Sequence, residues 1–139
     1  MGTRHQGYLL VLLATVTAMA VAVMFAPWLR TGSAVRNSFE VVQAADHLDV
    51  LPAGPQAIIS VVWAFLPLLA VLAVLALTVD RVPVAVGMTV VVGLVEAGFG
   101  AVVTNAPRSA GWGATAGLAL GLTLAVVSLA TAWITRDAT

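Results

Sequence analysis

The sequence predicts an all-α integral membrane protein: four membrane-spanning helices in a bundle, with a short amphipathic helix outside the membrane between the first and second spans. Two observations predict this class. Four long apolar stretches occupy residues 8–28, 57–79, 84–103 and 113–134, and about 20 apolar residues in a helix cross a bilayer core. Only 9% of the 139 residues are charged, whereas soluble domains carry about 25%. Lipid must therefore cover most of the surface.

The same composition excludes several classes of function. The formal net charge is zero, so the chain lacks the basic surface that nucleic acid requires. It has no cysteine, which excludes disulfides, thiolate metal sites and thiol catalysis. Asp46, His47 and Asp49 do not share one helix face, so we predict a solvated surface there and no metal site. We expect one transmembrane domain over residues 1–139, with no cofactor and no enzymatic activity.

The first apolar stretch is predicted to be a retained span. It has the basic start and the small-residue motif, at residues 18–20, that are typical of a signal peptide. However, the apolar run continues to Pro27 and is too long for a signal peptide. Tyr8, Trp28, Trp112 and Trp133 lie near span ends, and such residues favour the membrane–water interface. We therefore expect these four side chains at the two interfaces.

The breaks between spans carry recognisable helix signals. Asp80 is placed to cap the third span, with Pro83 in its first turn. The link between the second and third spans, residues 80–83, is so short that these two spans must be adjacent and antiparallel. Asn105 is suited to a left-handed cap at the end of the third span. Pro67, in the middle of the second span, removes one backbone hydrogen bond and predicts a bend.

The long break, residues 29–54, is predicted to form the outer segment. It opens with a turn signal at residues 30–33. Apolar residues then recur at helical spacing between Val35 and Leu48, with acidic residues among them, which predicts an amphipathic helix. We expect this helix to contact the mouth of the bundle or a partner protein. The contact residues are Phe39, Val42 and Leu48.

The distribution of arginines does not by itself decide which way the protein is oriented in the membrane. An even number of spans places both termini on one side, and the six arginines divide equally between the two sides, so the positive-inside rule does not decide. The short link at residues 80–83 and the short terminal tails favour a cytoplasmic location for both termini. The acid-rich outer segment would then lie outside the cytoplasm. Lysine is absent while Ala, Val and Gly abound, a composition typical of a high-GC bacterial genome. We therefore predict a multi-pass protein of a bacterial, and specifically actinobacterial, plasma membrane.

Glu96 is the sharpest candidate for chemistry. It lies inside the third span, where an ionised carboxylate is costly and an acid marks a candidate functional site. One interpretation is a proton or cation site. The other is a structural acid that is neutral or hydrogen-bonded to a neighbouring segment. We favour the structural interpretation, because no second ionisable group lies at comparable depth to relay a proton.

A stripe of small residues follows one face of the fourth span. Four-residue spacing lets another backbone approach closely along such a face. The close neighbour is either another helix of this bundle, which we favour, or a partner subunit. The residues of this small-residue face are Gly113, Gly117, Gly121 and Ala125.

Residues 26–39 read Ala-Pro-Trp-Leu-Arg-Thr-Gly-Ser-Ala-Val-Arg-Asn-Ser-Phe. A Pro-Trp that ends the first helix, followed by Gly and an Arg-x-Ser-aromatic element, resembles small four-span actinobacterial membrane proteins. The resemblance covers this boundary and the four-span layout. It implies an accessory subunit of a larger envelope assembly, with the Mce-type lipid transporters of mycobacteria as one context.

Two functions remain open from the sequence. The first is a non-enzymatic accessory subunit that stabilises a larger membrane complex, with membrane lipid and other membrane subunits, or a second copy of itself, as partners. The second is a small oligomeric proton-linked transporter or channel that uses Glu96. We favour the first, because the spans carry one ionisable group and no internal repeat.

Overall fold

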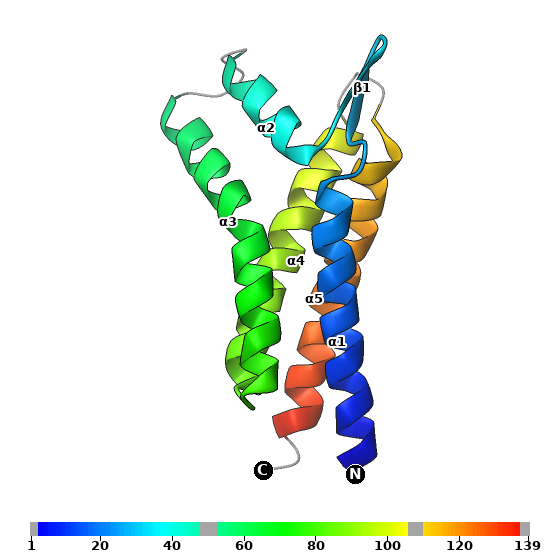
Figure 1. Ribbon diagram of the computed structural model, residues 1–139, viewed down its shortest axis with the longest axis vertical. Coiled ribbons are helices and arrows are strands. Elements are labelled where there is room, and N and C mark those ends of the chain that lie inside the picture. Colours follow the sequence, from blue (N-terminus) through cyan, green and yellow to red (C-terminus); the bar gives the residue numbers. More distant parts are fainter. Residues whose placement is uncertain (1–2, 48–52, 106–109, 137–139) are drawn as a thin grey trace.

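The computed structural model describes residues 3–47, 53–105 and 110–136 (Figure 1). Four helices in it are long and apolar enough to cross a membrane, which confirms the all-α, multi-pass prediction at that level. The start of the first helix and the end of the last lie at one end of the bundle, and the described part of the outer segment lies at the other (Figure 1). The elements are α1 (Thr3–Met24), β1 (Leu29–Thr31), β2 (Ala34–Arg36), α2 (Ser38–His47), α3 (Ala53–Thr78), α4 (Val82–Thr104) and α5 (Trp112–Arg136).

The bundle is asymmetric. Helices α4 and α5 form the closest pair, α1 packs mainly on α5, and α3 packs mainly on α4. Helix α3 changes direction along its length, and its first half leans away from the other helices (Figure 1). Pro67 lies near the middle of this helix. Because proline has no backbone N–H, the carbonyl of Trp63 loses its helical partner there, which accounts for the bend.

The first span ends earlier than predicted. Helix α1 stops at Met24, because Phe25 and Ala26 donate back to the carbonyls of Ala22 and Val23 and Pro27 has no N–H with which to continue. Residues 25–28 therefore leave the helical path. The other three spans agree with the predicted stretches to within four residues at each end.

A β-hairpin, which the sequence analysis did not predict, follows α1. Strands β1 and β2 pair antiparallel, with Leu29 opposite Arg36, and Gly32 occupies the turn with φ of +60°, a conformation that glycine adopts without strain. Val35 therefore lies in a strand, and the expectation that the outer helix begins there is wrong.

The outer helix begins at Ser38 because of a capping box. Asn37 Oδ1 accepts from the backbone N–H of Glu40 at 3.0 Å, and Glu40 Oε2 accepts from the backbone N–H of Asn37 at 2.8 Å. This reciprocal pair satisfies donors that would otherwise be free at the helix start. Leu48 and Asp49 lie outside the described residues.

Two predicted caps are corrected. Asp80 does not cap α4: its φ of +58° ends α3, and Arg81, which makes no side-chain cap, precedes α4. The chain turns sharply at Asp80, and the turn is closed by a hydrogen bond from the Arg81 N–H to the Ala76 carbonyl at 2.8 Å. Asn105 is not left-handed, with φ of −89°. Its Nδ2 instead donates to the Ala101 carbonyl at 2.7 Å, which satisfies a terminal carbonyl of α4.

Candidate functional site

The site begins with Trp28, which folds back into the mouth of the bundle. Its side chain is fully buried, and its Nε1 donates to the Val23 carbonyl at 2.7 Å. The indole lies against Gly113 and Gly117 of α5: a Cβ added at Gly117 would lie 2.5 Å from Trp28 Cζ2. Trp28 is therefore enclosed by the bundle, because two glycines leave a slot that the indole fills. Tyr8, Trp112 and Trp133 are largely exposed.

The rest of the small-residue face of α5 lies against α4. A Cβ added at Gly121 would lie 2.6 Å from the Ala97 nitrogen and 2.6 Å from the Gly93 carbonyl oxygen. One added at Gly93 would lie 2.9 Å from the Ala125 nitrogen. The structure thus places this face inside the chain's own bundle, where absent side chains allow the two backbones to approach.

Three aromatic rings meet beside this contact. Trp28, Trp63 of α3 and Phe99 of α4 pack with ring centroids 5.8 Å apart for Trp28–Trp63, 5.5 Å for Trp28–Phe99 and 4.3 Å for Trp63–Phe99. Tilted and edge-on pairs of this kind are favourable beyond the area that they bury. Hereafter these three side chains are called the aromatic cluster. The cluster was not predicted from the sequence, because its members are 35 and 36 residues apart along the chain.

A hydrogen-bond chain fixes the cluster to the outer segment. Trp63 Nε1 donates to Ser38 Oγ at 3.0 Å, and Ser38 Oγ donates to the Met24 carbonyl at 2.7 Å. Ser38 is fully buried at the start of α2. One hydroxyl therefore joins α3, α2 and the end of α1, and its loss would leave two buried polar groups without partners.

Glu96 lies on α4 at the same depth. Its side chain is fully buried, and neither carboxyl oxygen has a hydrogen-bond partner within the described part of the chain. Glu96 Oε1 would lie 3.5 Å from a Cβ added at Gly117, so Glu96 and Trp28 flank the same point on α5. Phe99 follows Glu96 by three residues and shares its helix face. The carboxyl thus adjoins the aromatic cluster, and the hydrogen bond predicted as one structural option is not seen among these residues.

A second polar contact lies deeper in the bundle. Ser128 Oγ of α5 donates to Thr89 Oγ1 of α4 at 2.7 Å, and both side chains are fully buried. Both hydroxyls also contact carbonyls of their own helices. Hydroxyls in apolar spans often bond between helices in this way, a signal that the sequence analysis left unused.

The outer helix contacts the bundle through two of the three predicted residues. Val42 is buried, and its carbonyl accepts from Gln56 Nε2 of α3 at 3.1 Å. Phe39 packs on Phe25, with ring centroids 5.3 Å apart. Leu48, the third, lies outside the described residues.

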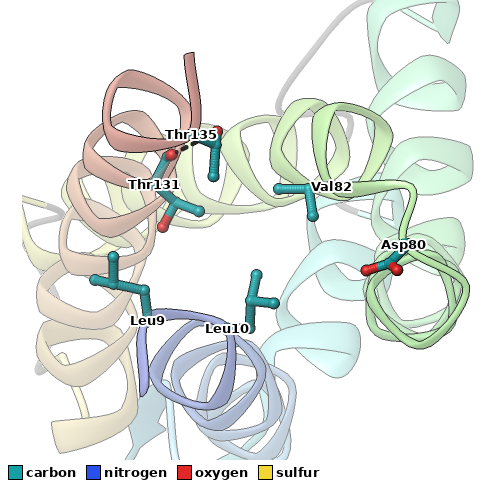
Figure 2. A pocket seen from close by; sticks show the side chains of 6 residues that line it. All are labelled: Leu9, Leu10, Asp80, Val82, Thr131 and Thr135. Atoms are coloured by element: carbon teal, nitrogen blue, oxygen red, sulfur yellow. Dashed lines mark hydrogen bonds between the residues drawn. The ribbon is translucent and has the colours of Figure 1, made fainter. Parts of the chain in front are cut away.

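Cavities among the described residues also lie away from this site. A pocket of about 130 Å³ opens at the end of the bundle that carries the termini, between α1, α5 and the α3–α4 link, and Asp80 lies at its edge (Figure 2). A groove of about 330 Å³ runs between α1 and α3. Its lining is apolar apart from Thr17, whose hydroxyl donates to the Leu13 carbonyl at 2.7 Å. The groove therefore offers hydrocarbon contact and no unused donor from Thr17.

Comparison of the chain with family models, with curated proteins and with solved structures found no match.

Proposed function

We propose that this chain is a non-enzymatic accessory subunit that stabilises a larger membrane complex of a bacterial envelope, with a lipid transporter as the specific context. The observation that supports this most directly is the outward face of α3. Of the four long helices, α3 is the most apolar and the least buried. Large side chains such as Phe65 and Leu68 point away from the bundle and are more than half exposed.

The arrangement of the other helices also supports docking through α3. The small-residue face of α5 is already covered by Trp28 and α4, so it is not available to a partner helix. Helix α3 leans away from the bundle at the end that carries the outer segment (Figure 1). A partner helix seated against α3 would bury apolar surface that otherwise faces lipid, and such contacts are driven by van der Waals packing.

In the proposed topology both termini are cytoplasmic and the hairpin and α2 are extracytoplasmic. The outer helix then lies at the membrane surface with Glu40 and Gln43 exposed and Val42 turned inward. Such an arrangement is typical of an amphipathic helix that caps a bundle. The lipid-transport context draws on the apolar groove between α1 and α3, which suits an acyl chain.

Photocrosslinking in the native bacterium tests the accessory function. A photoreactive phenylalanine at Phe65 or Leu68 of α3 should crosslink to one membrane protein of defined mass. The matched control is the same photoreactive residue at Val126 or Leu129 of α5, two positions that are slightly more exposed than Phe65 and Leu68 and should yield lipid adducts alone. A crosslink to a second copy of this chain would replace the accessory function with a homo-oligomer. Lipid adducts alone at all four positions would refute docking through α3.

A second candidate function, a proton-linked transporter or channel, is favoured by one observation. Glu96 is fully buried with both oxygens unpartnered among the described residues, and such groups call for an explanation. Reconstituted vesicles test it: a proton-coupled flux that Glu96→Gln abolishes would establish transport, since Gln cannot release a proton. If the acid is structural, Glu96→Gln preserves assembly, whereas Glu96→Leu weakens it.

A further inference from the structure

We propose that Glu96 and the aromatic cluster form a binding site for a lipophilic organic cation. The inference goes beyond docking on a partner and holds whether or not the chain has one. It starts from the carboxyl of Glu96, a fully buried acid whose two oxygens have no partner in the described residues. Leaving a buried polar group unpaired is costly, so a ligand that supplies the missing charge is the occupant that this position favours.

The surroundings of Glu96 select the chemical class. Trp28 adjoins the carboxyl across Gly117, and Phe99 and Trp63 complete the aromatic cluster. The indole N–H of Trp28 already donates to the Val23 carbonyl, and that of Trp63 donates to Ser38 Oγ. In this structure the rings pack on one another and on Gly117, so a cation would meet their π faces, rather than hydrogen-bonding groups, once the cluster opens. Aromatic faces attract cations, and most strongly where water is excluded. An apolar body that carries a delocalised or quaternary positive charge fits this combination.

The charge around Glu96 also favours a cation from outside the chain. Helix α3 has no titratable residue, and the only one in α5 is Arg136 in its last turn. The titratable residues of α1 all lie in its first two turns, at the opposite end of the bundle. Arg30 and Arg36 belong to the hairpin beyond the bundle mouth. Among the described residues no cation in the spans neutralises Glu96, so within this part of the chain the acid is accommodated as its protonated form or beside an external cation.

Access follows from the bend in α3. Trp63, which closes the aromatic cluster, is carried on the half of α3 that leans away from the bundle (Figure 1). Pro67 leaves the Trp63 carbonyl without its helical hydrogen bond, which makes this turn the natural pivot. Glu96, Trp28 and Trp63 are closely packed in this structure, so entry of a cation requires the first half of α3 to swing about Pro67, which would move Trp63 outward and open space beside Glu96. On binding, the cation replaces the carboxyl proton, which is released to solvent.

Tetraphenylphosphonium binding to the purified protein in nonionic detergent tests the site. Replacing Trp112 and Trp133 with Phe in every variant leaves Trp28 and Trp63 as the only tryptophans, so quenching reports on the aromatic cluster. We expect saturable quenching whose affinity weakens as the pH is lowered, because the proton and the cation compete for Glu96. Absence of saturable quenching in a correctly folded protein would overturn the proposal.

Two variants and a control sharpen the test. Glu96→Gln keeps the shape of the neutral acid and should weaken binding at least tenfold and remove its pH dependence. Glu40→Gln, in the exposed turn of α2, keeps its capping box and should bind as the parent does. Equal binding by Glu96→Gln and Glu40→Gln would refute the role of Glu96. Pro67→Ala should slow association about tenfold by restoring the missing backbone bond, and an unchanged rate would refute the pivot.

Discussion

The substitution Gly121→Ala measures how closely α4 and α5 approach. The added Cβ would lie 2.6 Å from the Ala97 nitrogen and from the Gly93 carbonyl oxygen. Ordinary van der Waals contacts of a Cβ with other heavy atoms lie at 3.4–4 Å, and contacts under 3.0 Å are essentially never seen. Both neighbours are backbone atoms of α4, so no change of rotamer relieves the overlap, and the two helices must separate by about 1 Å.

The expected cost follows from two opposing effects. Overpacking a close contact destabilises a protein by about 1–3 kcal/mol, and the upper end applies here because backbone must move. Replacing Gly by Ala inside a helix returns about 1 kcal/mol through helix propensity. The free energy of unfolding should therefore fall by about 2 kcal/mol. Gly98→Ala is the matched control on α4: its Cβ meets no atom within 4 Å, so it gains propensity alone.

Reversible unfolding in mixed micelles, with dodecyl sulfate as the denaturant and far-ultraviolet circular dichroism as the readout, compares the two variants. We expect Gly98→Ala to equal or exceed the parent protein and Gly121→Ala to unfold at a clearly lower detergent fraction. If the two variants unfold together, the near contact of the two backbones is absent and the account of the small-residue face is wrong.

Three further predictions follow from the same structure. Gly117→Leu should abolish accumulation of folded protein, because its branched side chain would occupy the place of the Trp28 indole; normal yield and normal elution on size exclusion would contradict this. Ser38→Ala should lower the free energy of unfolding by about 1–3 kcal/mol, since it leaves the Trp63 N–H buried without an acceptor, and an unchanged unfolding midpoint would show that the hydroxyl is dispensable. In this cysteine-free chain, a cysteine at Ser33 should react with an impermeant maleimide in intact cells while one at Arg81 is protected, and the reverse pattern would invert the topology.

The sequence by itself determined the four spans, because bilayer insertion is a local property. A helix satisfies its own backbone hydrogen bonds, and only helices or closed barrels do so in lipid, so length and apolarity suffice to find each span. The bend at Pro67 was also predicted, since a missing N–H acts on its own helix. The turn at residues 30–33 was predicted, but Val35 was assigned to a helix and lies in a strand. The pairing of Leu29 with Arg36 that forms the hairpin is a contact between separate strands, which local sequence patterns do not reveal.

Tertiary structure alone decided the site. The sequence marked Glu96 and Gly117 separately, and their proximity required α4 and α5 to pack in one particular register. Trp28 was expected at the interface because an isolated tryptophan at a span end prefers that position. Its enclosure by the bundle was not expected, and it arises because Gly117, 89 residues further along the chain, leaves an indole-sized space. Burial of this kind depends on the shape of a distant neighbour, and hydropathy, which adds residues one at a time, carries no information about it.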